Sequence, residues 1–160
     1  MTLRKRQPTI GEAFDAHFMN DSERVAAYVR ELRHYRPRGF SALAREGDKL
    51  AEDLDSPTCS PDAADIMDSW FTDVESMLTD WARRVARNDY VCFGPFENVG
   101  SVGFYYAVDS AMEDCDIQLD AGDSVPRGFS GMASFVTDHG NVAVRRYSRG
   151  RMTRELFDVV

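Results

Sequence analysis

The chain has 160 residues, of which 43% are hydrophobic and 29% are charged, and its formal net charge is −8. A chain of this length can bury about 70% of its unfolded surface, so it does not need disulfides or metal ions for stability. The excess of carboxylates argues against generic binding to DNA, RNA or an anionic membrane, because all three repel a negative surface. We expect a single domain over residues 9–160, preceded by a flexible basic segment at residues 1–8.

The sequence carries no signal for export or membrane insertion. The basic residues near the N-terminus are followed by no apolar stretch, and no window approaches the roughly eighteen apolar residues of a membrane span. Cys59, Cys92 and Cys115 are odd in number and widely spaced, which is typical of reduced thiols rather than of a disulfide framework. These features predict a cytoplasmic protein.

Helical patterns dominate the first 55 residues. Thr9 and Glu12 have the spacing of a capping box, and the residues after Thr9 place a set of side chains on one helical face: Ile10, Ala13, Phe14, His17 and Phe18. A second helix is predicted from Asp21 or Ser22 to a stop at Pro37, with five residues facing inward: Val25, Tyr28, Val29, Leu32 and Tyr35. A third, weaker helix is predicted from Ser41 to Leu54, interrupted by Gly47.

The strongest predicted element is a helix that begins at Ser60. Ser60 is a suitable N-cap, and Pro61 and Asp62 suit the first helical turn. Apolar residues then recur at spacings of three and four: Ala63, Met67, Trp70, Val74, Met77, Trp81 and Val85. This pattern predicts an amphipathic helix.

After Asn88 the sequence changes to short β-prone segments bounded by Gly, Pro, Asn or Asp. The candidate strands are 90–93, 102–108, 115–119, 132–137 and 142–147. His139-Gly140 provides a turn between the last two strands, and residues 151–160 fit either a closing strand or a short helix. Gly103, inside the second strand, indicates a bulge or a close backbone approach.

Helices followed by strands predict an α+β fold. In this arrangement the N-terminal helices, within residues 9–88, pack on one face of a C-terminal antiparallel β-sheet of about five strands, within residues 89–160.

Charged residues are segregated along the chain. Eleven carboxylates and one base, Lys49, lie between Glu46 and Asp80, and six carboxylates without a base lie between Asp109 and Asp123. From residue 124 to the C-terminus, six arginines outnumber three acids. Segregation of this kind bears on partners and steering rather than on the fold.

The acidic segments are either ordinary solvated faces or a surface that imitates nucleic acid. Duplex DNA carries one charge per about 1.7 Å of axis, whereas the acids from Asp62 to Asp80 give one per about 4.5 Å of helix. Mimicry therefore requires the acids of residues 46–55 or 109–123, or a second subunit, to join this helix. The candidate partner-binding residues are Asp65, Asp68, Asp73, Glu75, Asp114 and Asp116.

The segment from Arg145 to Arg151 interleaves arginine with tyrosine, a pattern that can hold phosphate or stack on a base. Within a strand, Arg145 and Arg146 point to opposite faces, which dilutes any single patch. The net charge favours pairing with the acidic segments or solvation instead, so no direct binding of DNA or RNA is expected.

Motifs for catalysis or cofactor binding are missing from the sequence. Gly128-Phe129-Ser130-Gly131 lacks the spacing of a Gly-x-Ser-x-Gly nucleophile elbow. The acids near Asp114 and Asp120 offer hard oxygens, but their spacing does not match a calcium loop. We therefore predict no catalytic residue, no cofactor and no metal.

The resulting hypothesis is a small acidic protein that binds an Arg/Lys-lined protein surface. It would inhibit nucleic-acid-binding machinery, as a DNA mimic of the counter-defence type such as an anti-CRISPR or anti-restriction protein. The alternative is an enzyme or small-molecule-binding module with a pocket between sheet and helices, lined by Tyr105, Tyr106, His139 and Arg145. A third interpretation is an assembly subunit that self-associates, for instance as a homodimer, through its apolar stripe.

Overall fold

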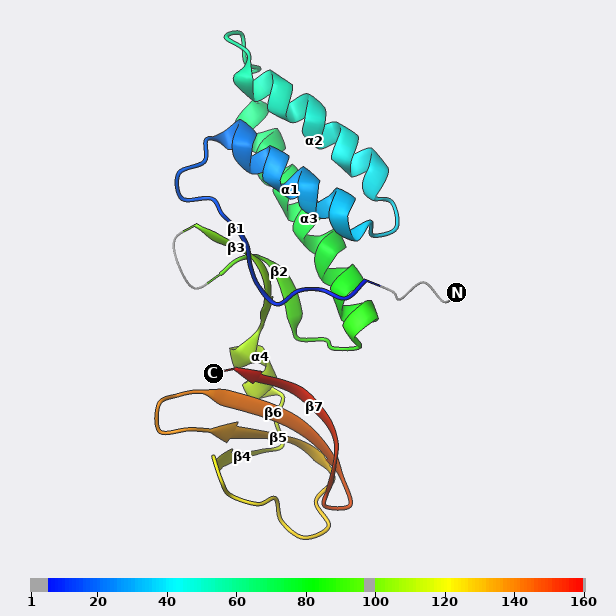
Figure 1. Cartoon of the computed structure of the whole chain (residues 1–160), viewed down its shortest axis with the longest axis vertical. Coiled ribbons are helices and arrows are strands. Elements are labelled where there is room, and N and C mark those ends of the chain that lie inside the picture. Colours follow the sequence, from blue (N-terminus) through cyan, green and yellow to red (C-terminus); the bar gives the residue numbers. More distant parts are fainter. Residues whose placement is uncertain (1–5, 97–99, 160) are drawn as a thin grey trace. The chain divides into compact units, whose positions relative to one another are not determined.

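A computed structural model of the chain describes residues 6–96 and 100–159. The described residues form four helices and seven strands, which confirms the predicted α+β class (Figure 1). Contacts divide the chain into two compact units, Met1–Tyr105 and Tyr106–Val160. This boundary lies within the third strand rather than at Asn88, where the composition changes. Most of the basic segment at residues 1–8 lies outside the described residues.

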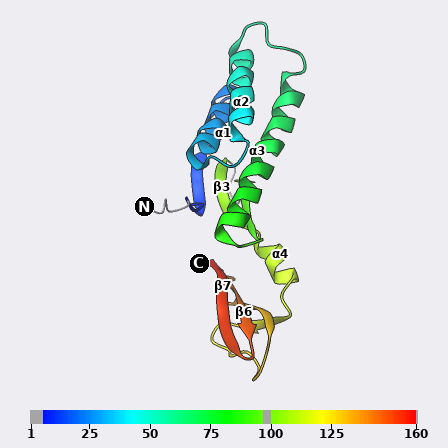
Figure 2. The ribbon, with the colours of Figure 1, turned by 90° about the vertical axis from the view of Figure 1, so that its right-hand side faces the viewer.

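The first unit combines three long helices with a small sheet. Its elements are β1 (Gly11–Asp15), α1 (Asp21–Tyr35), α2 (Phe40–Asp55), α3 (Ala63–Ala86), β2 (Val91–Pro95) and β3 (Ser101–Tyr106). The strands have the order β1-β3-β2, and β1 runs antiparallel to β3. The three helices lie alongside one another (Figure 2).

The core of the first unit is aromatic. The Tyr28 ring lies 5.8 Å from Phe93, which lies 4.9 Å from Phe104, and the Phe104 ring lies 5.1 Å from Tyr35. All five residues predicted to face inward from α1 are buried, as are five of the seven stripe residues of α3. Helical periodicity therefore identifies the packed faces of both helices.

The second unit contains α4 (Val108–Glu113), β4 (Ile117–Asp120), β5 (Gly131–Val136), β6 (Val142–Ser148) and β7 (Arg151–Val159). Its strands have the order β4-β5-β6-β7, in which β4 and β5 are parallel and the other pairs are antiparallel. A small cluster of Ala133, Phe135 and Ala143 is covered by Val125 and Phe129 from the long β4–β5 connection.

The segment predicted as the first helix is a strand. Residues of β1 pair with β3, and the Ser101 hydroxyl donates a 2.6 Å hydrogen bond to the Glu12 carboxylate. Within the predicted apolar face, Phe14 is buried whereas Phe18 is 91% exposed. The capping box instead lies at Asn20 and Glu23, immediately before α1. Backbone pairing with β3 thus outweighs a short amphipathic pattern.

Other boundaries differ in detail from the sequence prediction. The described strands form two sheets instead of one sheet of about five strands, and residues 151–159 are a strand. The N-cap of α3 is Asp62 rather than Ser60, and Val108 begins α4 rather than ending β3. Gly47 does not interrupt α2. The Trp70 ring of α3 occupies the space that a side chain at residue 47 would take.

Candidate binding groove

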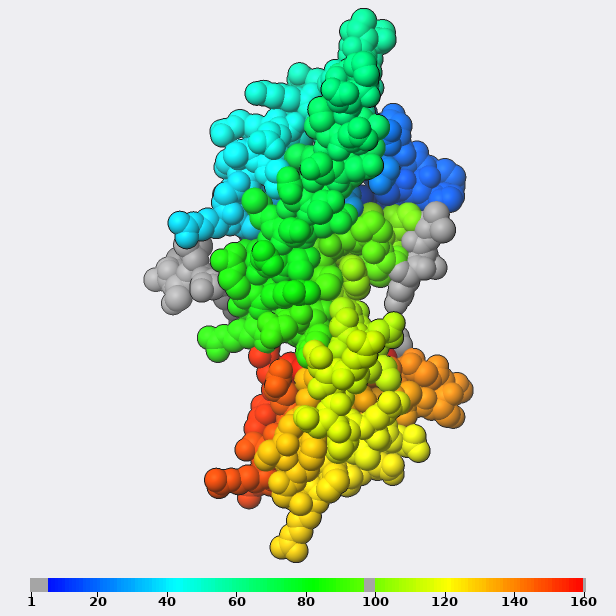
Figure 3. Space-filling model, turned by 180° about the vertical axis from the view of Figure 1, so that it is seen from behind, coloured from blue at the N-terminus to red at the C-terminus, as the bar shows by residue number. Residues whose placement is uncertain are grey.

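A groove of about 660 Å³ runs between α2 and α3 in the first unit. Figure 3 shows these two helices side by side on one face of the molecule. Each helix contributes one stripe at spacings of three and four, which is the periodicity of a single helix face. The residues that line the groove are Glu46, Lys49, Leu50, Asp53, Asp65, Ile66, Ser69, Trp70 and Asp73.

The floor of the groove is apolar and tightly constructed. The Trp70 side chain is 4% exposed, and its indole N–H donates a 2.9 Å hydrogen bond to the buried carbonyl of Leu43. A Cβ at Gly47 would overlap the Trp70 ring and lie 2.5 Å from a methyl group of Val29. Gly47 therefore lets α2 approach both neighbouring helices, which fixes the spacing of α2 and α3.

The rim of the groove is acidic. Four carboxylates against one ammonium group leave three excess negative charges, and the acids are Glu46, Asp53, Asp65 and Asp73. Ile66 lies between the two acids of α3 and is 51% exposed. A concave surface with an apolar floor and a charged rim resembles the anatomy of a protein-binding site.

Two of the six predicted partner-binding residues, Asp65 and Asp73, line this groove. Asp68 is exposed on α3 but outside the lining. The structure places Glu46 and Asp53 of α2 in the same lining as Asp65 and Asp73 of α3. Both α2 acids belong to residues 46–55, whose acids are one possible addition to the charge of α3.

Glu75 has a different environment from the other predicted acids. Its side chain is half-buried and accepts a 2.8 Å hydrogen bond from the Tyr28 hydroxyl. Burial raises the pKa of the Glu75 carboxyl, whereas the Tyr28 hydrogen bond and the Arg24 charge oppose that increase. Burial also raises the pKa of Tyr28, and the Glu75 charge adds to this effect. Glu75 is therefore tied to the core rather than presented to a partner.

Replacing Glu75 with glutamine is expected to stabilise the chain at neutral pH by less than about 1 kcal/mol, because solvent screens the half-exposed carboxyl. The raised pKa means that the folded state holds the Glu75 proton to higher pH than the unfolded state does. This contribution is present below the ordinary value of 4.5 and is lost as the pH rises through the raised pKa. Glutamine can still accept from Tyr28 and does not titrate. Urea unfolding across this range measures the difference, with Asp80→Asn as the exposed control. Equal or lower stability of Glu75→Gln at neutral pH would contradict the prediction.

Asp114 and Asp116 belong to the second unit. Asp114 is exposed at the C-terminal end of α4. The Asp116 carboxylate accepts a 2.8 Å hydrogen bond from the Met132 N–H, and the Asp116 N–H donates to the Met132 carbonyl at 2.8 Å. Asp116 thus joins the start of β4 to β5. The acidic segments at residues 46–80 and 109–123 are expected to share one surface, and this expectation stays a prediction.

The residues of the predicted pocket have separate surroundings. Tyr105 belongs to the first unit and stacks on Phe96 at 5.4 Å. In the second unit, Tyr106 stacks on Phe157, and His139 is exposed in the β5–β6 loop. Arg145 lines a hollow of about 230 Å³ whose lining includes neither Tyr106 nor His139.

The described part of the chain contains no helix that is long and apolar enough to cross a membrane. Over residues 6–96 and 100–159, no three His, Cys, Asp or Glu side chains gather closely enough to hold a metal ion.

Comparison of the chain with protein-family models, curated proteins and solved structures finds no match.

Proposed function

We propose that this chain is a non-enzymatic binding protein whose groove between α2 and α3 receives an arginine- or lysine-bearing segment of a cytoplasmic partner. The observation that carries this proposal is the concave acidic rim over the apolar floor of Trp70 and Leu50. The partner is nucleic-acid-binding machinery, and occupation of its basic surface inhibits it. This activity is of the counter-defence type, as in anti-CRISPR or anti-restriction proteins.

The charge density of the groove supports a protein segment as the occupant. From Asp65 to Asp73, eight residue steps cover about 12 Å of helix, so the three excess negative charges of the rim give one per about 4 Å. Duplex DNA has one per about 1.7 Å. The charge density of the groove is therefore higher than that of α3 alone but does not reach that of a duplex. A basic amphipathic helix, which lays apolar residues on the floor and cations on the rim, matches both features.

Binding of a labelled amphipathic helix of leucine and arginine tests this groove directly. Fluorescence anisotropy at low and physiological salt is expected to show affinity that falls with salt. A variant with four neutral rim residues is expected to lose about fourfold or more in affinity, since each exposed ion pair contributes about 0.2–1 kcal/mol. The variant carries Glu46→Gln, Asp53→Asn, Asp65→Asn and Asp73→Asn.

The matched control removes four exposed carboxylates outside the groove lining of the first unit. It carries Glu52→Gln, Asp68→Asn, Asp80→Asn and Asp89→Asn. Equal losses in both variants would contradict a specific groove and indicate a diffuse acidic face.

The inhibitory role has its own readout with the same variants. The parent chain should restore phage growth in cells that express a restriction or RNA-guided nuclease, and the groove variant should not. Failure of the parent chain against such nucleases would reject that role while leaving the groove measurement in place.

A further inference from the structure

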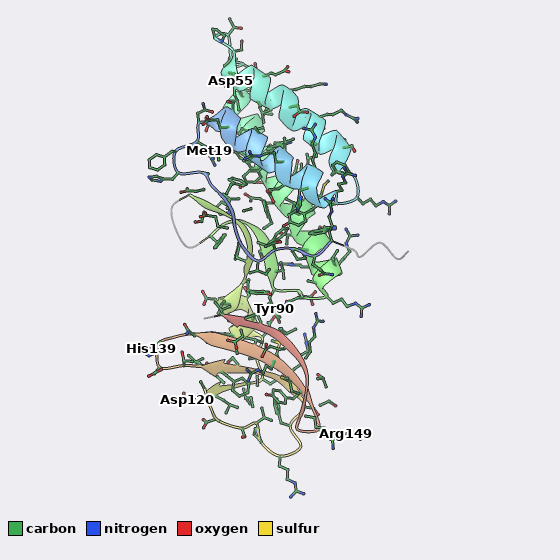
Figure 4. The ribbon with its side chains drawn as sticks, viewed as in Figure 1. Met19, Asp55, Tyr90, Asp120, His139 and Arg149 are labelled. Atoms are coloured by element: carbon green, nitrogen blue, oxygen red, sulfur yellow. The ribbon has the colours of Figure 1, made fainter. Side chains whose placement is uncertain are left out.

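One end of the second unit carries a cluster of arginines, none of which lines the groove between α2 and α3. Two segments meet there, residues 124–137 and residues 144–154, and neither contains an acidic residue. Arg145 of these segments pairs with Glu155. We call the other five arginines, which are exposed or half-buried, the arginine end, and they are Arg127, Arg146, Arg149, Arg151 and Arg154. Figure 4 places Arg149 at the β6–β7 turn, at the opposite end of the sheet from Asp120 and His139.

The turn that presents these arginines is held in place. Arg149 and Gly150 have positive φ angles of 52° and 78°, as a two-residue type I′ turn requires. The Arg149 N–H donates to the Ser130 hydroxyl at 2.8 Å, and the Gly150 N–H donates to the Phe129 carbonyl at 2.7 Å. These bonds attach the turn to the loop that carries Arg127. The structure therefore brings arginines that are far apart in sequence to one end of the sheet.

Three arginines of this end carry charges that no described acid neutralises. Arg145 pairs with Glu155 at 2.9 Å, but Arg127, Arg149 and Arg151 make no ion pair with any described residue. Arg146 lies directly across from Arg154 on neighbouring strands. Asp116 lies beside Gly131, but its carboxylate already accepts the Met132 N–H. Arg127, Arg149 and Arg151 are therefore accessible to an external anion.

We propose that the arginine end binds the phosphate backbone of a nucleic acid. Guanidinium groups match phosphate oxygens bidentately. A phosphate polymer also releases condensed counterions for each arginine that it binds. An acidic protein offers only exposed ion pairs of about 0.2–1 kcal/mol each, so the nucleic acid is the stronger ligand for scattered arginines.

The net charge of −8 does not prevent this binding. At physiological salt the Debye length is about 8 Å, so the charges near the β6–β7 turn, and not the sum over the whole chain, set the potential there. The expectation that the chain avoids direct contact with DNA or RNA rests on the whole-chain charge, whereas local charge determines phosphate binding. This inference is independent of the proposed groove function.

The test measures binding of labelled single-stranded and duplex oligonucleotides to the full chain over a range of salt. The altered chain carries Arg127→Gln, Arg149→Asn and Arg151→Gln, with asparagine at residue 149 because asparagine tolerates a positive φ. Its affinity should fall about tenfold or more, and the salt slope for a single strand should become shallower by about 2. Preference for one of the two oligonucleotides identifies the source of the phosphates, and either preference supports the proposal.

The matched control removes three exposed arginines of the first unit by Arg30→Gln, Arg38→Gln and Arg45→Gln. Circular dichroism and urea unfolding check that both altered chains remain folded. Three results would overturn the proposal. These are failure of the parent chain to bind either oligonucleotide, equal losses in the two altered chains, and binding of polyglutamate as tight as that of the oligonucleotides. The last result would assign the arginine end to an acidic protein.

Discussion

Replacing Trp70 with alanine is expected to lower the free energy of unfolding by about 3–5 kcal/mol. The Trp70 ring is almost fully buried, lies 5.5 Å from the Phe71 ring and 6.3 Å from the Tyr28 ring, and covers Gly47. Its removal leaves a cavity where the three helices meet and removes the donor to the Leu43 carbonyl. The same change deletes the floor of the groove, so affinity for the basic peptide should fall even where the variant remains folded.

Two further variants separate the causes of this loss. Trp70→Phe keeps most of the ring but removes the N–H that bonds Leu43, and its expected cost is about 1–3 kcal/mol. Ile66→Ala changes an exposed residue on the same helix and should cost less than about 1 kcal/mol. Urea unfolding followed by circular dichroism measures all three. If Trp70→Ala costs no more than Ile66→Ala, the indole does not join α2 to α3.

The sequence predicts the three long helices because their apolar positions repeat over many turns. In α3 the repeat extends from Ala63 to Trp81, so a shift of its first residue does not change the face that packs. The apolar pattern around β1 covers too few helical turns to establish such a repeat. Its partner is β3, about ninety positions away, and pairing over that separation leaves no periodic trace near Phe14. Local pattern therefore decides long elements, and tertiary pairing decides short ones.

The distinction between local pattern and tertiary contact also explains how much of the groove can be predicted from the sequence. Charge segregation identifies the acids of α2 and α3, but the sequence does not tell which of them face each other. Trp70 and Gly47 set that geometry, since the indole occupies the space that a side chain at Gly47 would take. Glu75 lies on the same helix as Asp65 and Asp73, yet its half-buried carboxylate accepts a hydrogen bond from Tyr28 of the core. A helix face rotates by about 100° per residue, so residues two positions apart have unlike surroundings.

Gly103 indicates where the sequence does reveal a tertiary contact. A glycine inside a strand predicts a bulge or a close approach of another backbone. In the structure Gly103 lies opposite Glu12, and the β1–β3 register shifts between Glu12 and Phe14. A Cβ at Gly103 would overlap the Gly11 carbonyl oxygen and lie 2.8 Å from the Ala13 nitrogen. The prediction of a close backbone approach is confirmed.

Replacing Gly103 with alanine is expected to cost about 3 kcal/mol or more, because the atoms that the new methyl group meets are backbone atoms that cannot rotate away. Relief requires β1 to move off β3, which would expose Phe14, whose ring lies 5.6 Å from Tyr28. Hydrogen exchange should therefore show lost protection in β1 while amides of α1 and α3 remain protected, and urea unfolding gives the total cost. Gly122→Ala is the control, since Gly122 also lacks a side chain but has open space around it and a φ of +98°. Its backbone strain should cost about 1 kcal/mol. Equal costs in the two variants would show that β1 yields freely, and the close approach at Gly103 would then contribute nothing specific to stability.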